Sequence, residues 1–485
     1  MSSRWSSSPR SGRVETPAYG HDLSHPAHVI DAALANAKPE PFWLDDPARP
    51  EPRPHLADKI TTDLIVVGGG FCGLWTAIIA KQRQPDRDVV LIEAARIGWA
   101  ASGRNGGFVE ASLTHGPDNG ALHFPDELST LDRLADENFA AFRETVATHD
   151  LDAEWEETGV LTVATEPHQV DGLRDAADEH SEFVTDAALR ELGDSPLYRA
   201  GLFDTHGVAY VHPAKLAWAL ARLAEDLGVK IFENTRATKL TTSTDRVVIR
   251  TEHGRIDADR VALATNAFPS LIPGLGLFTV PIYDYVLMTE PLTKAQLRDI
   301  GWTGRHGITD SSREFHYYRK TKDDRILFGG FDAVYHRGRK IRPEQDQRPE
   351  TFRRLADHFF STFPQLAGIR FTHTWGGVID MSTQLVAFHG TAKRGRVAYS
   401  AGYTGLGVAA TRFGAEVMLD LLEGRETDRT RLKMSRRLPI PIPPEPFAYP
   451  LIQLMRRAVQ KSDRNGGRDG ILLKVAGLFG VGFDS

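Results

Sequence analysis

The distribution of apolar residues early in the chain predicts a strand, a helix and a second strand in close succession. Residues 62–67 form a β-branched apolar run, and the apolar stretch 71–83 has the length of a helix that ends before Pro85. A second apolar run follows at 88–93. Because a strand, a helix and a strand within about 30 residues are typical of a parallel βαβ unit, a first domain is expected to begin near Lys59.

Helical periodicity recurs in three later segments. Apolar residues within 128–146 are three or four positions apart, which predicts an amphipathic helix with one buried stripe. A second helix is expected over 213–227, where a proline stands at the start and Gly228 follows the end. A third helix is expected to follow a glycine-rich turn at 402–407 and to end before Gly424.

Short strands are expected between these helices. From Phe278 to Phe331 the pattern is rich in strands, with a hairpin turn near 322–324, and this region is interpreted as a separate sheet domain. The other short apolar runs bounded by turn residues predict strands of a mixed sheet at 160–164, 229–232, 247–251, 260–264 and 397–399.

The two ends of the chain differ in composition from its middle. Residues 1–13 are rich in Ser and Arg and lack the apolar run of a secretory signal, so a disordered leader is expected. Six prolines within 39–54 favour an extended arm on the surface. The apolar tail 471–483 suggests membrane contact or, in the simpler interpretation, a docked C-terminal segment.

Composition narrows the classes of function. The chain has 485 residues, and its 58 Lys and Arg against 64 Asp and Glu give a net charge of −6, which does not favour nucleic-acid binding. Cys72 is the single cysteine, which excludes an intramolecular disulfide and a cysteine-cluster metal site, and no metal is expected. The longest apolar stretch, 64–80, is shorter than the ~20 residues of a membrane helix. We therefore expect a cytoplasmic protein without a membrane span.

The turn between the first strand and the helix carries a phosphate-binding pattern. Gly68, Gly70 and Gly73 fit G-x-G-x-x-G: the first permits a tight turn, the second lets backbone N–H groups approach a diphosphate, and the third lets the helix pack against the strand. Glu93 follows the second strand, where an acidic residue binds ribose hydroxyls and disfavours a 2′-phosphate. NAD and FAD fit this pattern equally, and a purely structural glycine turn is the alternative.

A second segment of small residues distinguishes these two cofactors. Residues 97–107 contain four glycines, which lets a large ligand touch the backbone. Within them, Ser-Gly-Arg-Asn-Gly-Gly at 102–107, together with Arg-Ile-Leu-Phe-Gly-Gly at 325–330, resembles the FAD-dependent oxidoreductases of the D-amino-acid oxidase type. That family includes glycine, sarcosine and gamma-glutamylputrescine oxidases, and the chain is most similar to the last branch. The resemblance covers roughly 42–422.

The resemblance implies an α/β fold in which a Rossmann-like FAD-binding domain is interleaved with an α+β substrate domain built on a mixed or antiparallel sheet. The FAD-binding domain is discontinuous in this arrangement. The expected boundaries are an N-terminal arm at 1–58, the FAD-binding domain at 59–115, 205–274 and 372–424, the substrate domain at 116–204 and 275–371, and a C-terminal extension at 425–485.

The resemblance also implies which residues contact FAD. The small-residue loop is expected to line the flavin, and the late turn places a helix N-terminus where reduced flavin carries negative charge. Structural glycine turns remain the alternative for both. Without a second cysteine, noncovalent FAD is expected, and a covalent histidine link stays open. The expected contacts are Gly68, Gly70, Phe71, Cys72, Gly73, Glu93, Ala94, Ser102, Gly103, Arg104, Asn105, Gly106, Gly107, Ala237, Thr265, Asn266, Gly402, Thr404, Gly405, Leu406 and Gly407.

No catalytic acid or base stands out in the sequence. Bulky and polar residues alternate over 315–319, so Tyr317 and Arg319 are candidates for positioning a substrate, although a packed strand explains them as well. Tyr283 and Tyr285 are weaker candidates for a cavity wall, and Trp375 is a candidate to cap the flavin ring. A place in the packed core explains each of the three equally well.

The implied reaction is oxidation of a C–N bond in an amine or amino acid, with a polyamine-derived or secondary amine favoured. Hydride transfer to flavin N5 gives an imine that hydrolyses, and oxygen or another acceptor takes the electrons. Two alternatives remain open. A nicotinamide-dependent dehydrogenase uses the same first βαβ unit, and a flavin-binding protein without amine oxidase activity has the same cofactor loops.

Overall fold

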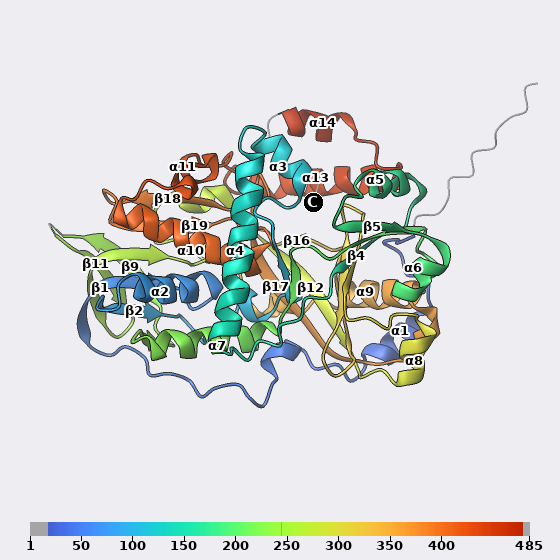
Figure 1. Cartoon of the computed structure of the whole chain (residues 1–485), viewed down its shortest axis with the longest axis horizontal. Coiled ribbons are helices and arrows are strands. Elements are labelled where there is room, and N and C mark those ends of the chain that lie inside the picture. The colour runs from blue at the N-terminus through green and yellow to red at the C-terminus, as the bar shows by residue number, and fades with distance from the viewer. Residues whose placement is uncertain (1–17, 244, 479–485) are drawn as a thin grey trace, which may run out of the picture.

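The computed structural model describes residues 18–243 and 245–478 and contains two large sheets side by side (Figure 1). Within these residues, an eight-stranded sheet lies at the left of the view and a nine-stranded sheet at the right. The leader predicted at 1–13 lies outside the described residues.

The eight-stranded sheet has a parallel centre, because β1 pairs in parallel with β2 and β11, and β11 pairs in parallel with β19. Its order is β18-β19-β11-β1-β2-β8, and β10 and β9 continue antiparallel from β11. The strands are β1 (Lys59–Val67), β2 (Val89–Ile92), β8 (Lys230–Phe232), β9 (Ala237–Thr242), β10 (Val247–Thr251), β11 (Arg255–Leu263), β18 (Phe388–Ala392) and β19 (Val397–Ala401).

Both faces of this sheet are buried, which explains the continuous apolar run in β1. Leu64 and Val66 pack in one core cluster with the helices α2 (Phe71–Arg83), α7 (Pro213–Asp226) and α10 (Gly407–Glu423), while Ile65 and Val67 pack in another with residues of β10. The predicted βαβ unit and the predicted helices at 71–83, 213–227 and after 402–407 are therefore confirmed.

The nine-stranded sheet has the order β16-β12-β15-β14-β13-β4-β6-β5, with β17 paired to β12. The hairpin predicted around 322–324 is confirmed as β14 and β15. Residues 372–382 belong to β17 and hence to this sheet, although the expected FAD-binding segment began at 372. The strands are β4 (Val160–Ala164), β5 (Ser181–Val184), β6 (Ala200–Asp204), β12 (Thr279–Thr289), β13 (Gly307–Asp310), β14 (His316–Lys320), β15 (Ile326–Gly330), β16 (Val334–Tyr335) and β17 (Phe371–Ser382).

The remaining elements join and cover the two sheets. The small pair β3 (Phe108–Glu110) and β7 (Val208–Tyr210) lies next to the small-residue loop, and the predicted amphipathic helix is confirmed as α4 (Leu128–Thr148), which crosses the front of Figure 1. The other helices are α1 (Ala27–Leu34), α3 (Pro117–His123), α5 (Val170–Asp175), α6 (Asp186–Leu192), α8 (Lys294–Asp299), α9 (Pro349–Thr362), α11 (Asp428–Arg431), α12 (Lys433–Arg436), α13 (Ala448–Arg464) and α14 (Ile471–Leu478).

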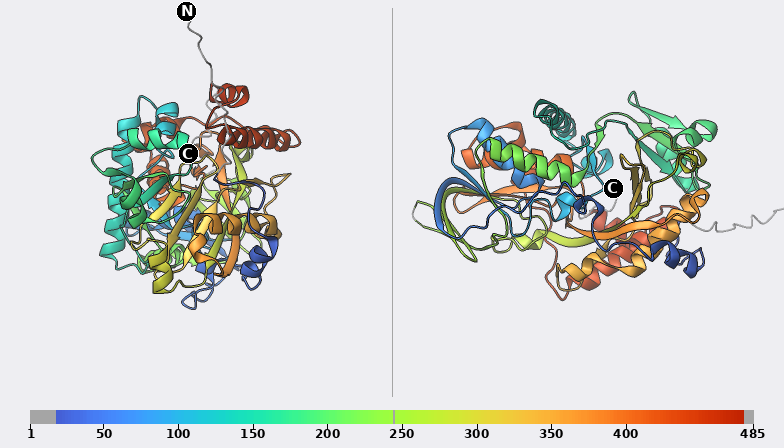
Figure 2. Two further views of the ribbon diagram at one scale, coloured as in Figure 1. Left: turned by 90° about the vertical axis from the view of Figure 1, so that its right-hand side faces the viewer. Right: turned by 90° about the horizontal axis from the view of Figure 1, so that it is seen from below.

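Both terminal segments dock on the nine-stranded side of the molecule. Helix α1 buries Ile30 and Ala33 in the same cluster as residues of α9, and the proline-rich arm that follows has one short helical turn, Phe42–Leu44. Helices α13 and α14 lie on the outside, at the top of both Figure 1 and the left view of Figure 2. Across 18–243 and 245–478, no helix has the length and apolar character needed to cross a membrane.

Candidate active site

Three connections meet at the carboxyl edge of the eight-stranded sheet, where α/β proteins bind ligands. They are the early glycine turn (68–73) after β1, the loop 264–268 after β11 and the late glycine turn (402–407) after β19. A Cβ atom on Gly68 would lie 2.3 Å from the carbonyl oxygen of Ala264, and Cys72 Sγ lies 3.3 Å from Tyr403 Oη. The two glycine turns are thus neighbours in space.

The early glycine turn is shaped by glycines that no other residue can replace without strain. Gly68 has a φ of +118°, and a Cβ on Gly73 would lie 1.8 Å from the carbonyl oxygen of Gly68. The amide of Phe71, at the start of α2, donates to Ser102 Oγ at 2.9 Å. First-turn amides of a helix carry partial positive charge and lack intrahelical acceptors, which suits them to bind a phosphate.

Glu93 stands at the end of β2 and is buried beside this turn. Its Oε2 accepts the amide of Gly69 at 2.7 Å, and its Oε1 accepts the amide of Ala95 at 2.8 Å and Nε1 of Trp99 at 2.9 Å. Burial raises the pKa of Glu93, while these hydrogen bonds lower it. Trp99 is a contact that the sequence analysis missed.

The small-residue loop (97–107) joins the early glycine turn to the nine-stranded sheet. The side-chain amide of Asn105 donates to the carbonyl oxygens of Ala101 and Ser102, which closes the loop on itself. Arg104 Nη1 reaches Asp346 at 2.5 Å and the carbonyl oxygen of Gly376 at 2.9 Å. The guanidinium of Arg104 therefore contacts the nine-stranded sheet region, while the backbone of the loop faces the early turn.

The late glycine turn is held by a buried carboxylate that the sequence analysis did not single out. Asp380 Oδ2 accepts the amide of Gly402 at 2.6 Å, and Oδ1 accepts the amide of Tyr403 at 3.1 Å and the side-chain amide of Asn266 at 3.0 Å. Burial raises the pKa of Asp380 to about 7. Its only signal in the sequence is a lone acidic residue within an apolar strand.

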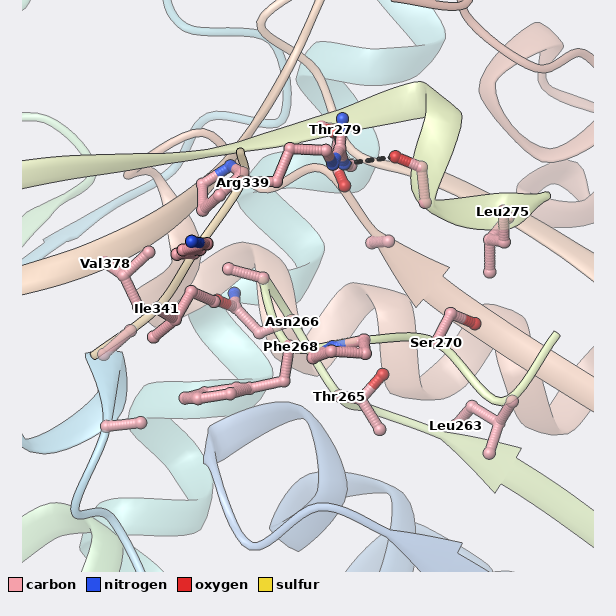
Figure 3. Close-up of a pocket in the computed structure, with 18 of the residues that line it drawn as sticks. Leu263, Thr265, Asn266, Phe268, Ser270, Leu275, Thr279, Arg339, Ile341 and Val378 are labelled. Carbon is pink, nitrogen blue, oxygen red and sulfur yellow. Dashed lines mark hydrogen bonds between the residues drawn. The ribbon is translucent and has the colours of Figure 1, made fainter. Parts of the chain in front are cut away.

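A cavity of about 870 Å³ opens where the loop after β11 faces the nine-stranded sheet (Figure 3). Figure 3 shows Thr265, Asn266 and Phe268 on that loop, with Ile341 and Val378 across the cavity. Oδ1 of Asn266 is buried without a protein hydrogen-bond partner among the described residues, so it is available to a ligand. The expected contact Ala237 follows Arg236, which also lines the cavity.

These features fit FAD. The glycine turn has no room for side chains where a diphosphate would lie, Glu93 ends the strand where ribose binds, and a second helix N-terminus follows the late turn. Apart from Ala237, which begins β9, the expected contacts are in the early turn, after β2, in the small-residue loop, after β11 and in the late turn, which the fold brings together along one edge.

Tyr317 and Arg319, the two substrate candidates, lie against the small-residue loop but differ in environment. A Cβ on Gly106 would lie 2.7 Å from Tyr317 Cε2, and Tyr317 is partly exposed. Arg319 is buried, and its Nη1 donates to the carbonyl oxygens of Gly107 at 3.2 Å and Val211 at 2.8 Å. Arg319 thus holds the backbone of the loop.

Tyr317 Oη donates a short hydrogen bond to Asp284 on β12, a residue that the sequence analysis missed. Burial raises the pKa of Asp284 to about 6. The weaker candidates Tyr283 and Tyr285 are stacked and buried, with Tyr285 against Phe352 of α9, and Trp375 donates to the carbonyl oxygen of Arg104. Asp284 had one signal in the sequence, a single acid between apolar and aromatic residues.

The known proteins that resemble this chain in sequence or in fold include several oxidoreductases. The chain is 28% identical over 379 residues to the Gamma-glutamylputrescine oxidoreductase of Escherichia coli, covering 76% of this chain and 85% of that protein, and 26% identical over 402 residues to the Probable oxidoreductase OrdL of Haemophilus influenzae, covering 80% and 88%. The glycine oxidase structure from Geobacillus kaustophilus superposes with a TM-score of 0.62 at 18% identity, over 76% of this chain and 96% of that one. Residues 63–421 match the DAO family of FAD dependent oxidoreductases, and the chain belongs to that family.

Proposed function

We propose that this protein oxidises a C–N bond of an amine or amino acid with FAD, with a polyamine-derived or secondary amine as the favoured substrate. The observation that carries the proposal is the position of Gly106. This glycine belongs to the loop that adjoins the cofactor edge, and Tyr317 of the nine-stranded sheet packs directly on it. A flavin bound along the edge would border the sheet face that carries Tyr317 and Asp284.

The chain's own residues supply binding and orientation. Amides of the early glycine turn and the N-terminus of α2 would hold the diphosphate of FAD, Glu93 would accept hydrogen bonds from its ribose, and amides of the late turn and the N-terminus of α10 would bind its flavin end. When bound, FAD would supply the acceptor for the hydride that leaves the carbon beside the amine nitrogen, and water would hydrolyse the resulting imine. Arg319 acts as a positioning residue, because it fixes the carbonyl oxygens of Gly107 and Val211.

The comparisons support the choice of reaction. The family is FAD-dependent, which favours FAD over the nicotinamide-dependent alternative. The Escherichia coli relative is an oxidoreductase of gamma-glutamylputrescine, a polyamine-derived compound, and this supports an amine of that kind for the present chain.

Anaerobic reduction of the purified flavoprotein tests the proposal. Polyamine-derived amines, secondary amines and amino acids are added separately, and bleaching of the flavin absorbance is followed. At least one amine is expected to bleach the flavin within seconds, and readmission of air, in parallel with an artificial acceptor, identifies the electron acceptor. A flavin that no member of the panel reduces would instead establish a flavin-binding protein without amine oxidase activity.

A further inference from the structure

One face of the nine-stranded sheet is turned toward both cofactor loops. Alternate residues of a strand share a face, and the register places Gly377 opposite Asp284, and Ile379 opposite Ile282. At one side of this face, Tyr317 packs on Gly106 of the small-residue loop. At the other, a Cβ on Gly405 of the late turn would lie 3.9 Å from Ile379 Cδ1. The residues that β12 and β17 contribute to this face are Val280, Ile282, Asp284, Val286, Met288, His373, Trp375, Gly377, Ile379 and Met381.

Asp284 is the single carboxylate among the residues that β12, β14, β15 and β17 contribute to this face. Neither of the two basic groups on this face donates to Asp284. Arg319 donates through Nη1 to the carbonyl oxygens of Gly107 and Val211, and its Nε has no hydrogen-bond partner among the described residues. His373 Nε2 contacts Asp45.

The donors that reach Asp284 are all neutral. They are the hydroxyl of Tyr317 and the backbone amides of Tyr285 and Gly330. Burial without a cation disfavours the ionised form, and the pKa of Asp284 is raised to about 6. Because the side chain is also partly exposed, a cationic ligand can reach it and supply the missing charge.

Near Asp284 the charge of Asp332 is felt, and Arg104 Cβ would lie 3.5 Å from a Cβ on Gly377, the residue opposite Asp284. Apolar residues lie further along the same two strands. Val280, Ile282, Ile379 and Met381 form one cluster with Ile442, Tyr449 and Ile452 of the C-terminal extension. Helix α13 therefore closes this end of the sheet face with an apolar wall. A site of this kind combines one anionic group with apolar walls, which is complementary to an ammonium group on a hydrocarbon chain.

We propose that Asp284, positioned by Tyr317, binds the ammonium group of the substrate, and that the substrate is an amine without a carboxylate next to the reacting carbon. The proposal rests on the proposed function and names its substrate class. A carboxylate on the reacting carbon would meet a like charge near Asp284, and this repulsion selects amines against amino acids.

Matched substrate pairs test the selection on the holoenzyme. Ornithine is 1,4-diaminobutane with one added carboxylate, and norvaline is related to butylamine in the same way. For the wild-type protein, kcat/KM is expected to be at least 100-fold higher for the amine of each pair. Asp284→Asn is expected to lower kcat/KM for the amines at least 100-fold and to reduce each ratio below tenfold. The control is Glu290→Gln, which changes an exposed ion pair with Arg370 next to the end of the same strand and leaves kcat/KM unchanged.

A binding measurement separates this inference from the proposed function. Tetramethylammonium, a cation that has no N–H or reacting amine, and tert-butanol, a neutral molecule of similar size, are titrated calorimetrically. The wild-type protein is expected to bind tetramethylammonium at least tenfold more tightly than Asp284→Asn does, with Tyr317→Phe between them and tert-butanol insensitive to all variants. Flavin absorbance verifies that each variant is folded and loaded.

Two results would overturn the inference. One is equal binding of tetramethylammonium by the wild-type protein and Asp284→Asn. The other is a wild-type protein that oxidises ornithine or norvaline as efficiently as the matched amine. Cation binding that depends on Asp284, combined with a flavin that no amine reduces, would overturn the proposed reaction and leave the cation site intact.

Discussion

The cofactor edge of the eight-stranded sheet and the Asp284 face of the nine-stranded sheet recognise ligands by different means. At the edge, the close backbone packing of Gly68 and Gly73 and the positive φ of Gly402 set the shape of the turns, and the side chains of Glu93 and Asn266 stand beside them. The face is built from side chains such as Asp284 and Tyr317, which lie 33 positions apart in the chain and meet through strand register. Cofactor binding is therefore encoded locally, whereas substrate binding depends on the tertiary fold.

The two regions also use buried carboxylates differently. Asp380 is fully buried, and its donors are two amides of the late turn and the Asn266 side chain. Asp284 is partly exposed, and its donors among the described residues are neutral, as those of Asp380 are. The first carboxylate shapes the protein, and the second is suited to act on a ligand.

A substitution that distorts the backbone of the early glycine turn is expected to have the largest effect, which is a loss of FAD affinity. In Gly73→Ala, the new methyl group would lie 1.8 Å from the carbonyl oxygen of Gly68, so the turn must open. We expect FAD affinity to fall at least about 100-fold, measured by fluorescence titration of the apoprotein. Gly172→Ala in α5 is the control, because a Cβ there meets nothing within 4 Å and FAD binding should be unchanged. Full FAD affinity in Gly73→Ala would contradict the backbone role.

Removing the carboxylate beneath the late turn is expected to have the next largest effect. Asp380→Ala leaves the buried amides of Gly402 and Tyr403 without an acceptor, which costs about 3 kcal/mol of unfolding free energy. Urea unfolding of the apoprotein measures this loss. Asp380→Asn keeps one acceptor oxygen and should lose clearly less. Equal stability of the alanine variant and the wild-type protein would show that the late turn does not depend on Asp380.

Features that depend on local sequence could be predicted, whereas features that depend on strand pairing could not. The early turn, Glu93 and the helices at 71–83 and 213–227 were predictable because glycine spacing and apolar periodicity are local signals. Asp284 and Asp380 were not, because a single acidic residue in a strand acquires its role only from the strand paired beside it. Strand pairing also decides where β17 belongs. Its pairing with β12 places it in the nine-stranded sheet, and the sequence contains no local signal for that pairing.

Neutralising Asp284 should stabilise the protein, in contrast to Asp380→Ala. The folded-state pKa of about 6 lies above the unfolded value of 3.8, so the folded protein binds the proton more tightly and Asp284 lowers stability as pH rises from about 4 to 6. Asp284→Asn should therefore gain about 3 kcal/mol of unfolding free energy at pH 8 and less than about 1 kcal/mol at pH 4.

Urea unfolding of the wild-type protein and Asp284→Asn at both pH values measures this difference. Tyr317 and Asp332 also influence Asp284, the first through its hydrogen bond and the second through its charge, and both remain in the variant. If Asp284→Asn raises the unfolding free energy by the same amount at pH 4 and pH 8, the gain must come from packing and not from removal of the charge. A loss at pH 8 would mean that Asp284 supports the fold, as Asp380 does.

The smallest effect is expected from a side chain at the early glycine turn. Cys72 is buried, and burial raises the pKa of its thiol to about 12, so the thiol is protonated at neutral pH and contacts Tyr403 Oη at 3.3 Å. If FAD binds mainly to the backbone of this turn, Cys72→Ala should lower the unfolding free energy by only about 1 kcal/mol. Its FAD affinity should stay within about threefold of the wild-type value. The fluorescence titration used for Gly73→Ala compares the two variants directly. A loss of FAD affinity as large as that of Gly73→Ala would show that side chains matter at this edge as they do around Asp284, and the contrast between the two regions would then fail.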